Sequence, residues 1–376
     1  MDDTQTFVTA ETLAQKAGRL CAEFDSRAAS HDEDDSFVAE NFARLRDEGL
    51  LAAAVPEELS GGGAEIAELA DMLRCLGKGC GSSALAFAMH THSVAAPAWR
   101  WRHQPQTRPA VEPLLRKVAE GAVLVTSGGS DWIGGSGRAE RVEGGWRIEA
   151  RKVFASSSPV GTLISTAAVA GDKVIHFALP LDAPEVRKMD NWRTLGMRGT
   201  GSQDLMVQGF FVPDDKVALI RDAGRWHPLW HIIVTNAFPL IYAVYLGVAE
   251  GARDLALRHA AKRGGDVTRR LAGEMDTALW AARVAHAEMV RTAEENQPGE
   301  EAVNRIMMGR QVVENRAITT VELAMELAGG AGFFRESGLE RRFRDIQAAR
   351  YHPMRRDTQQ AYAGALALGE SVAAIY

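Results

Sequence analysis

Apolar side chains in the first third of the chain recur every three to four residues, which is the period of an amphipathic helix. Phe37 and Val38 begin this pattern, Phe42 and Leu45 continue it at spacings of four and three residues from Val38, and Gly49 ends it. A loop rich in proline and glycine comes next, after which the helical period resumes. Helices connected by loops are therefore predicted for about residues 9–120.

The middle of the chain changes to the alternation that is typical of strands. Residues 143–145, Glu-Gly-Gly, join two such stretches as a hairpin, and Trp146, Ile148 and Ala150 alternate with charged residues. Short apolar runs of the same kind lie at residues 122–126, 163–169, 174–179 and 205–212. They predict a small β-barrel or sandwich that ends near Pro213.

The helical period returns after Trp226 and continues to the end of the chain. Long helices are predicted at about residues 229–262, 266–296, 300–328 and 338–373. One of them carries the apolar stripe Ile306, Val313, Ala317, Val321, Ala324 and Ala328, which is typical of helices in a four-helix bundle. The predicted fold class is α+β and mostly α: an N-terminal helical domain at residues 1–121, a β domain at 122–225 and a helical bundle at 226–376.

Composition excludes several classes of protein. The 376 residues are 46% hydrophobic and carry a net charge of −6 without a long basic run, so neither nucleic acid nor an anionic membrane is an expected partner. Cys21, Cys75 and Cys80 form neither a disulfide framework nor a CxxC metal pair, so we expect a reducing cytoplasm and no metal. We expect no stretch that is apolar for the roughly 18 residues of a membrane span, and no export signal.

Two short segments of the β domain have side chains suited to a flat ligand. A strand ending in Thr126 and Ser127 before glycines offers hydroxyls and unhindered N–H groups to a heteroaromatic ring. Phe154 offers stacking area and Ser156 a hydrogen bond. The alternatives are a glycine-rich turn without ligand, a core position for Phe154 and an exposed turn at Ser156.

The domain order resembles the acyl-CoA dehydrogenase family over nearly the whole chain, and four segments at the domain junctions carry this resemblance. They are residues 126–131 (TSGGSD), 152–156 (KVFAS), 195–202 (LGMRGTGS) and 329–333 (GGAGF). The resemblance implies a flavin against Thr126, Ser127, Phe154 and Ser156, with Ser130 near the substrate. The loop after Thr126 is two residues shorter than the family's Thr-Glu-Pro-x-x-Gly-Ser-Asp.

The same resemblance implies a second cofactor contact in the bundle. Gly329, Gly330 and Gly332 would hold the adenosine diphosphate part of FAD from a neighbouring subunit, and Arg263 would reach across to it. Glu326 stands where the family prefers glutamine, and its carboxylate would repel a pyrophosphate. Helix capping is the alternative for one glycine and for the arginine. The expected cofactor is FAD, with FMN or reduced flavin as alternatives, and a homo-oligomer, dimer or tetramer, is expected.

The usual catalytic base of the family is missing. Dehydrogenation beside a thioester needs a carboxylate in an apolar pocket, but its place falls at Pro353, and residues 230–238 of the first bundle helix contain no acid. Another branch of the fold hydroxylates aromatic or sulfur compounds with reduced flavin and O₂ and has histidines near the flavin. His352 and His92 fit that catalytic role, and His90 a substrate contact, with packing as the alternative for His90 and His92.

These observations predict an acyl-CoA dehydrogenase-like flavin-dependent oxidoreductase that acts on CH–CH donors and transfers hydride to flavin N5. Its partners would be a small acyl-CoA substrate and an electron-transfer flavoprotein. The first alternative is a reduced-flavin-dependent monooxygenase with an aromatic substrate and a flavin reductase. The second is a non-catalytic homologue that keeps only the fold.

Overall fold

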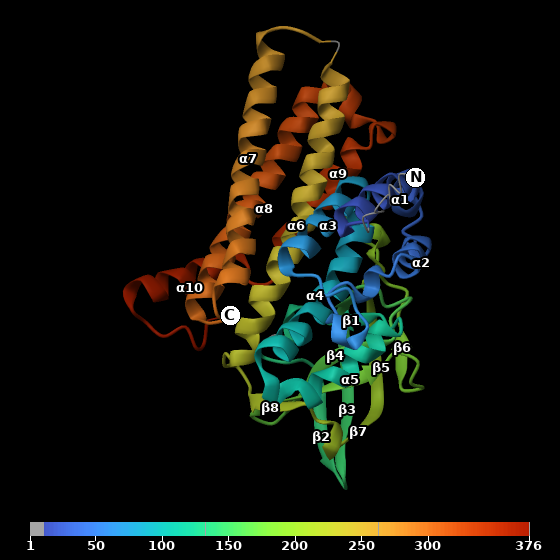
Figure 1. Ribbon diagram of the computed structural model, residues 1–376, viewed down its shortest axis with the longest axis vertical. Coiled ribbons are helices and arrows are strands. Elements are labelled where there is room, and N and C mark those ends of the chain that lie inside the picture. The colour runs from blue at the N-terminus through green and yellow to red at the C-terminus, as the bar shows by residue number, and fades with distance from the viewer. Residues whose placement is uncertain (1–10, 132, 262, 376) are drawn as a thin grey trace, which may run out of the picture.

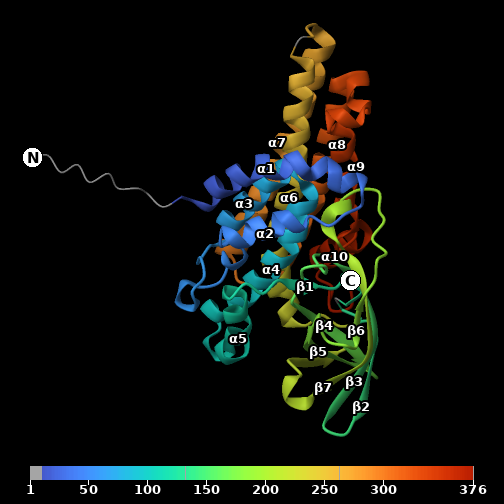
Figure 2. The same cartoon turned by 90° about the vertical axis from the view of Figure 1, so that its right-hand side faces the viewer.

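The computed structural model describes residues 11–131, 133–261 and 263–375, and it confirms the predicted order of helices, sheet and helices (Figure 1). The N-terminal helices are α1 (Leu13–Glu33), α2 (Ala39–Asp47), α3 (Ile66–Gly79), α4 (Gly81–His103) and α5 (Arg108–Ala119). Gly49 follows α2 in the left-handed conformation, with φ of 73°, as its predicted role as a helix stop requires. Helix α4 contacts both β1 and the bundle helix α6 and so links the sheet to the helical core (Figure 2).

The middle domain is one eight-stranded mixed sheet with a hydrophobic cluster of its own. Its strands are β1 (Leu124–Thr126), β2 (Arg138–Val142), β3 (Gly145–Ala155), β4 (Leu163–Ala170), β5 (Lys173–Pro180), β6 (Val186–Lys188), β7 (Gln203–Pro213) and β8 (Leu219–Asp222). They are ordered β6-β7-β3-β2-β4-β5-β8, and β1 pairs in parallel with β4. The predicted hairpin is β2–β3, whereas the short strands β6 and β8 were not predicted.

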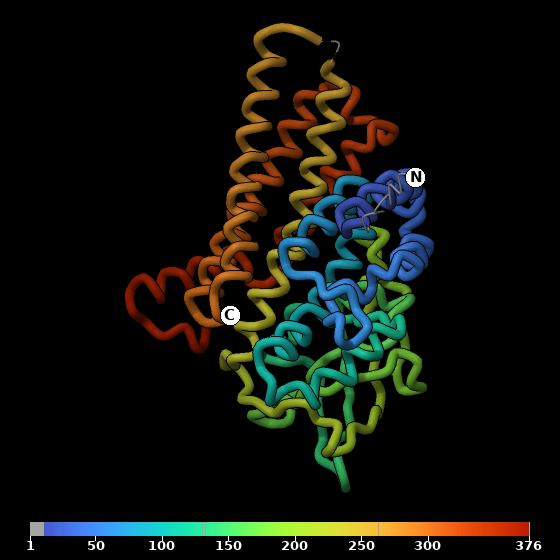
Figure 3. Tube along the Cα trace, in the orientation of Figure 1, coloured from blue at the N-terminus to red at the C-terminus, as the bar shows by residue number. Residues whose placement is uncertain are grey.

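The C-terminal helices are α6 (Pro228–Ala260), α7 (Asp266–Glu295), α8 (Glu300–Ala328), α9 (Leu339–Ile346) and α10 (Arg356–Leu368). The prediction of one last helix at residues 338–373 was wrong, because the chain breaks into short turns between α9 and α10 (Figure 3). Pro353 lies in this break and has no N–H for a helix. The hydroxyl of Tyr242 donates to the carbonyl of Ala349 at 2.8 Å, and Arg310 Nη2 donates to the carbonyl of His352 at 2.9 Å. Side chains from α6 and α8 thus replace helical hydrogen bonds in the break.

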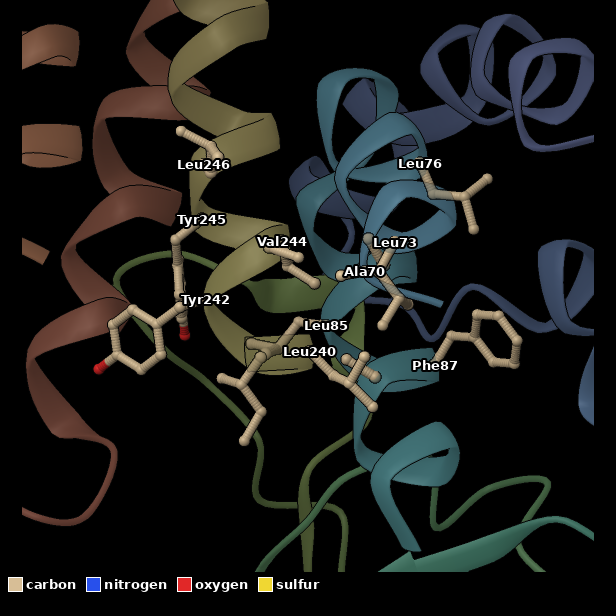
Figure 4. Packing of buried hydrophobic residues seen from close by; sticks show 14 of the residues in the cluster. Ala70, Leu73, Leu76, Leu85, Phe87, Leu240, Tyr242, Val244, Tyr245 and Leu246 are labelled. Carbon is tan, nitrogen blue, oxygen red and sulfur yellow. The ribbon is translucent and has the colours of Figure 1, made fainter. Parts of the chain in front are cut away.

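Helix α6 is the centre of the helical core. An 18-residue window in it has a mean hydropathy of 1.8, so by length and composition alone this helix could span a membrane. The expectation that the chain contains no such stretch was therefore wrong. This window is 94% buried inside the protein. In Figure 4, Leu240 and Val244 point toward α3 and α4, while Tyr242 and Tyr245 point to the opposite side of α6. The apolar length of α6 is therefore used in packing against other helices.

Helices α3 and α6 touch through glycines, which gives a test of this packing. A Cβ at Gly247 would collide with the carbonyl of Arg74, whereas a Cβ at Gly273 in α7 would meet nothing within 4 Å. We expect Gly247→Ala to lower stability by about 1–3 kcal/mol through overpacking. Gly273→Ala should raise stability by roughly 0.5–1 kcal/mol, because alanine has less backbone entropy to lose. Urea unfolding of both variants measures the difference, and equal shifts would contradict the close α3–α6 contact.

Candidate functional site

A buried ion pair fastens the glycine-rich loop after β1 to the sheet. Lys152 continues the inward face of β3, and its side chain is 0% exposed. Its Nζ donates to both carboxylate oxygens of Asp131, at 2.9 and 3.0 Å, and to the carbonyls of Ser136 and Ala167. Burial lowers the pKa of Lys152, and Asp131 partly opposes this effect. The sequence analysis missed this pair, although a lysine in the inward register of a strand was a signal for it.

The hydroxyl side chains at the end of β1 have different surroundings. Ser127 donates to the Asp131 carboxylate and lies 3.3 Å from the hydroxyl of Thr166. Thr126 ends β1 and is half-buried. The predicted substrate contact at Ser130 concerns a side chain outside the described part of the structure. Ser127 is therefore engaged within the loop itself, and Thr126 keeps the freer hydroxyl.

Phe154 is an exposed aromatic residue in a strained backbone conformation. A register shift in the β3–β7 pairing falls between Lys152 and Ala155, and Phe154 has φ of 56° and is 56% exposed. The left-handed region costs a residue other than glycine about 1–2 kcal/mol. Its ring meets that of Trp192 edge to face, with centroids 5.8 Å apart. The alternative of a core position for Phe154 was wrong, because the bulge leaves its aromatic ring exposed.

Ser156 begins a chain of buried hydroxyls. Its Oγ lies 2.7 Å from Oγ of Ser202, which lies 2.7 Å from the hydroxyl of Thr200. All three side chains are buried, so the alternative of an exposed turn at Ser156 was wrong. Ser202 and Thr200 belong to the 195–202 segment, and this segment is tied to α9 by the Met197 N–H, which donates to Asp345 at 2.5 Å. Two of the segments that carry the resemblance thus meet at the sheet.

His352 lies in the break between α9 and α10 and faces α6. Its Nε2 is 2.6 Å from the hydroxyl of Tyr245. Burial, with smaller contributions from the positive charge of Arg310 and from His92, lowers the pKa of His352 to about 3. The pKa of His92, on α4, is lowered to about 4, first by burial and then by His90. The lowered pKa values favour the neutral form of both predicted catalytic histidines, His352 and His92.

His90 has a structural role that leaves no ring nitrogen for a substrate. Its Nε2 lies 2.9 Å from the carbonyl of Leu51, and its Nδ1 accepts the N–H of Leu124 at 3.0 Å. The ring joins α4 to the loop after α2 and to β1. Burial lowers its pKa to about 4. The prediction of a substrate contact at His90 is therefore wrong, and the packing alternative describes this residue.

The glycine loop of the bundle follows α8 and lies against α9. Arg263 Nη2 donates to the carbonyls of Leu327 and Ala328 at 2.7 and 2.9 Å and so caps the end of α8 in its own chain. Gly329 has φ of 63°, which only glycine adopts readily, while Gly330 and Glu326 are exposed and Gly332 is buried. A contact of this loop with the cofactor of a neighbouring subunit stays a prediction.

A cavity of about 430 Å³ opens between the loop after β1 and the break before α10. This volume is in the range of small-molecule sites. Pro353, at the place of the missing base, forms part of the wall, and a Cβ at Gly129 would lie 2.7 Å from its ring. The lining residues are Gly129, Ile133, Trp226, Tyr351, Pro353, Met354, Arg355, Asp357 and Thr358. Across the described residues, no group of His, Cys, Asp and Glu is arranged to hold a metal ion.

The residues at this junction fit a flavin. An exposed aromatic face at Phe154 suits a planar ring, and the hydroxyl of the half-buried Thr126 suits its polar edge. The hydroxyl of Ser156 is buried against Ser202, and its contact with a flavin stays a prediction. A bound flavin would supply the redox chemistry. N-terminal helices, a middle sheet and a C-terminal helical bundle that meet at this site are the architecture of a flavin-dependent oxidoreductase.

The family assignment rests on two matches. Residues 9–117 match the acyl-CoA dehydrogenase N-terminal domain, and residues 240–356 match the acyl-CoA dehydrogenase C-terminal domain. The chain therefore belongs to the acyl-CoA dehydrogenase family, as its sequence predicts, and is a flavin-dependent enzyme.

Individual relatives include enzymes with different reactions. Amino sugar nitrososynthase DnmZ from Streptomyces peucetius is 29% identical over 93% of this chain and 91% of its own length. Cyclohex-1-ene-1-carbonyl-CoA dehydrogenase from Geobacter metallireducens is 26% identical over 86% of this chain and 88% of its own. The structure of KijD3 in complex with FMN and dTDP-3-amino-2,3,6-trideoxy-4-keto-3-methyl-D-glucose is 27% identical, with a TM-score of 0.84 and coverage of 96% and 97%. The chain is thus similar both to dehydrogenases and to enzymes that act on amino sugars.

The buried ion pair predicts a large asymmetry between two aspartate variants. Asp131→Asn leaves the charge of Lys152 buried without a counter-ion and should lower stability by about 3–5 kcal/mol. Asp214→Asn breaks the solvent-exposed pair with Arg141 and should change stability little, because water and salt screen that pair. Denaturant unfolding of both variants checks the difference, and a similar loss in both would show that Lys152 does not depend on Asp131.

The buried histidines predict a loss of stability in acid. Unfolded histidine takes up a proton below its ordinary pKa near 6.5, whereas folded His90 does so only near 4, so stability falls as the pH drops through this window. For His90 alone the loss from pH 7 to pH 5 is about 2 kcal/mol. His90→Gln should remove this part of the pH dependence, although it lowers stability at pH 7. His103→Gln, at an exposed position on the same helix, is the control and should leave the slope unchanged.

Proposed function

We propose that this chain is a reduced-flavin-dependent monooxygenase that oxygenates the nitrogen of a nucleotide-linked amino sugar. The observation that carries this proposal is the lack, in the described part of the site, of a carboxylate free to act as the base of a dehydrogenase. The first expectation from the sequence was an acyl-CoA dehydrogenase. The proposal instead takes up the monooxygenase alternative, with an amino sugar in place of an aromatic substrate.

The acids around the junction have other tasks. Asp131 neutralises Lys152, and Glu314 pairs with the fully buried Arg310 at 2.8 Å. Asp345 accepts the N–H of Met197, and burial raises its pKa. Asp357 lines the cavity, but its side chain is 72% exposed and lies beside Arg355. A base for an α-proton needs a carboxylate in an apolar pocket, and none of these four provides it.

The histidines do not replace that base. A pKa of about 3 makes His352 a poor proton acceptor at neutral pH, and His92 is similar. Neutral imidazoles are suited to donating and accepting hydrogen bonds around oxygen and amine groups. Oxygenation of an amine needs hydrogen-bonding groups of this kind beside the flavin, whereas dehydrogenation next to a thioester needs a base strong enough to remove the α-proton.

The substrate and cofactor are chosen from the relatives together with this site. DnmZ acts on an amino sugar, and the KijD3 complex contains FMN and a dTDP-linked amino sugar. An exposed Glu326 beside the bundle glycine loop disfavours the pyrophosphate of FAD, and Arg263 is used as a cap, so FMN is the proposed cofactor, supplied by a separate flavin reductase. The net reaction converts amine, reduced flavin and O₂ into hydroxylamine, oxidised flavin and water.

Two assays separate this function from dehydrogenation. Purified protein with enzymatically reduced FMN, O₂ and a dTDP-linked amino sugar should consume O₂ and yield a product heavier by one oxygen atom. Without oxygen, a panel of acyl-CoA thioesters should leave the absorption of bound oxidised flavin unchanged. Bleaching of the flavin by an acyl-CoA, without amine oxygenation, would overturn the proposal in favour of a dehydrogenase. Absence of any flavin binding, oxidised or reduced, would instead indicate a non-catalytic homologue.

Flavin binding itself gives a further prediction. Phe154→Ala removes the exposed aromatic face and should raise the Kd for reduced FMN about 3- to 10-fold, which corresponds to one aromatic contact. Phe211→Ala is the control, because Phe211 is an exposed phenylalanine near the opposite end of β7 from the site. Anaerobic fluorescence titration measures both affinities. An unchanged Kd for Phe154→Ala would exclude this residue from the flavin site.

A further inference from the structure

In the hydrogen bond between Tyr245 and His352, one assignment of donor and acceptor is favoured. The hydroxyl of Tyr245 is fully buried, and His352 Nε2, at 2.6 Å, is its one hydrogen-bond partner among the described residues. If Nε2 carried the proton, the hydroxyl would accept it, and its own hydrogen would be left buried without an acceptor. Burial raises the pKa of Tyr245 well above its usual value, so the hydroxyl keeps its hydrogen. The hydroxyl therefore donates, and Nε2 accepts.

This direction determines the other ring nitrogen. A neutral imidazole has one N–H, so a ring that accepts at Nε2 carries its proton on Nδ1. No described protein atom accepts a hydrogen bond from Nδ1 of His352, whose side chain is half-buried. The free donor is therefore available to a molecule other than the protein.

The backbone of His352 is held by a separate set of contacts. Arg310 Nη2 donates to the His352 carbonyl at 2.9 Å and to that of Ala349 at 3.3 Å, while Nη1 pairs with Glu314 at 2.8 Å. The hydroxyl of Tyr242, one turn before Tyr245 on α6, also donates to Ala349. Tyr242 therefore fixes the segment that carries His352, and Tyr245 fixes the ring.

We propose that Tyr245 is a positioning residue that fixes His352 as the neutral tautomer with its proton on Nδ1. His352 stands between the cavity-wall residues Tyr351 and Pro353, and its Nδ1–H would donate a hydrogen bond to a molecule bound there. The inference deepens the proposed function and rests on it for the identity of the acceptor, an oxygen or nitrogen atom of flavin or substrate. It assigns to His352 a donor role in place of the proton-accepting role expected from the sequence.

The groups around the ring keep this state over a wide pH range. Arg310 and His92 oppose a positive charge on His352, and Tyr242 and Tyr245 stay protonated because burial raises the pKa of both. Of the two acids near Tyr245, Glu314 pairs with Arg310 at 2.8 Å, and Asp345 accepts the N–H of Met197. The donor on Nδ1 therefore persists in weak acid, where an ordinary histidine would gain a second proton.

The tautomer can be measured without turnover. Solid-state NMR of full-length protein with ¹⁵N- and ¹³C-labelled histidine distinguishes Nδ1–H from Nε2–H rings, and His352→Gln identifies the signals of His352. We expect Nδ1–H in the wild type and in Tyr242→Phe, the matched control, and a shift toward Nε2–H in Tyr245→Phe. An Nε2–H ring in the wild type, or an unchanged tautomer in Tyr245→Phe, would overturn the inference.

Kinetics test the consequence for the reaction. With reduced FMN and the amino-sugar substrate, Tyr245→Phe should lower kcat about 5- to 10-fold, the effect of one hydrogen bond, with little change in KM. An unchanged kcat would contradict a positioning role even if the tautomer shifts. If no amine is oxygenated at all, the proposed function fails while the NMR result still decides the tautomer, so the two failures are distinguishable.

Discussion

The geometry of the site depends on one ion pair from which water is excluded. Lys152 occupies an inward position of β3, where the neighbouring inward residues are apolar, and its charge is tolerated only because Asp131 and two carbonyls surround it. This pair holds the loop after β1 against the sheet. The pairing of β3 with β7 shifts register directly after Lys152. Phe154 then points outward, and Ser156 lies against the buried hydroxyl of Ser202. The buried ion pair and the irregular stretch that exposes Phe154 are thus adjacent on β3.

On the other side of the junction, a second buried charge has a similar effect on the bundle. Arg310 pairs with Glu314 and donates to the carbonyls of the break between α9 and α10. A continuous helix would satisfy those carbonyls itself, so the arginine is what makes the break stable. The break places His352 against α6 and Pro353 at the cavity wall. The two halves of the site therefore each contain a desolvated cation that bonds to backbone carbonyls elsewhere in the chain: Lys152 to those of Ser136 and Ala167, and Arg310 to those of Ala349 and His352.

Local patterns in the sequence predicted those features that depend on neighbouring residues. The alternation around Trp146 and Ile148 produced the β2–β3 hairpin, and the stripe from Ile306 to Ala328 is buried in α8. The errors share one origin: each concerns residues whose hydrogen-bond partners are distant in the chain. One last helix was expected where Pro353 lies in a break, and His90 was assigned to a substrate although both its nitrogens bind backbone atoms of Leu51 and Leu124.

By itself, the sequence determined the order of the three structural parts, the faces that are buried and the family to which the chain belongs, because hydrophobic period and local motifs act over a few residues. It also showed that the usual glutamate is missing. Only the tertiary structure decided which polar groups pair, as Lys152 does with Asp131 and Tyr245 with His352. Such pairs join residues that are far apart in the chain, and their protonation depends on how much water the packed helices and sheet exclude.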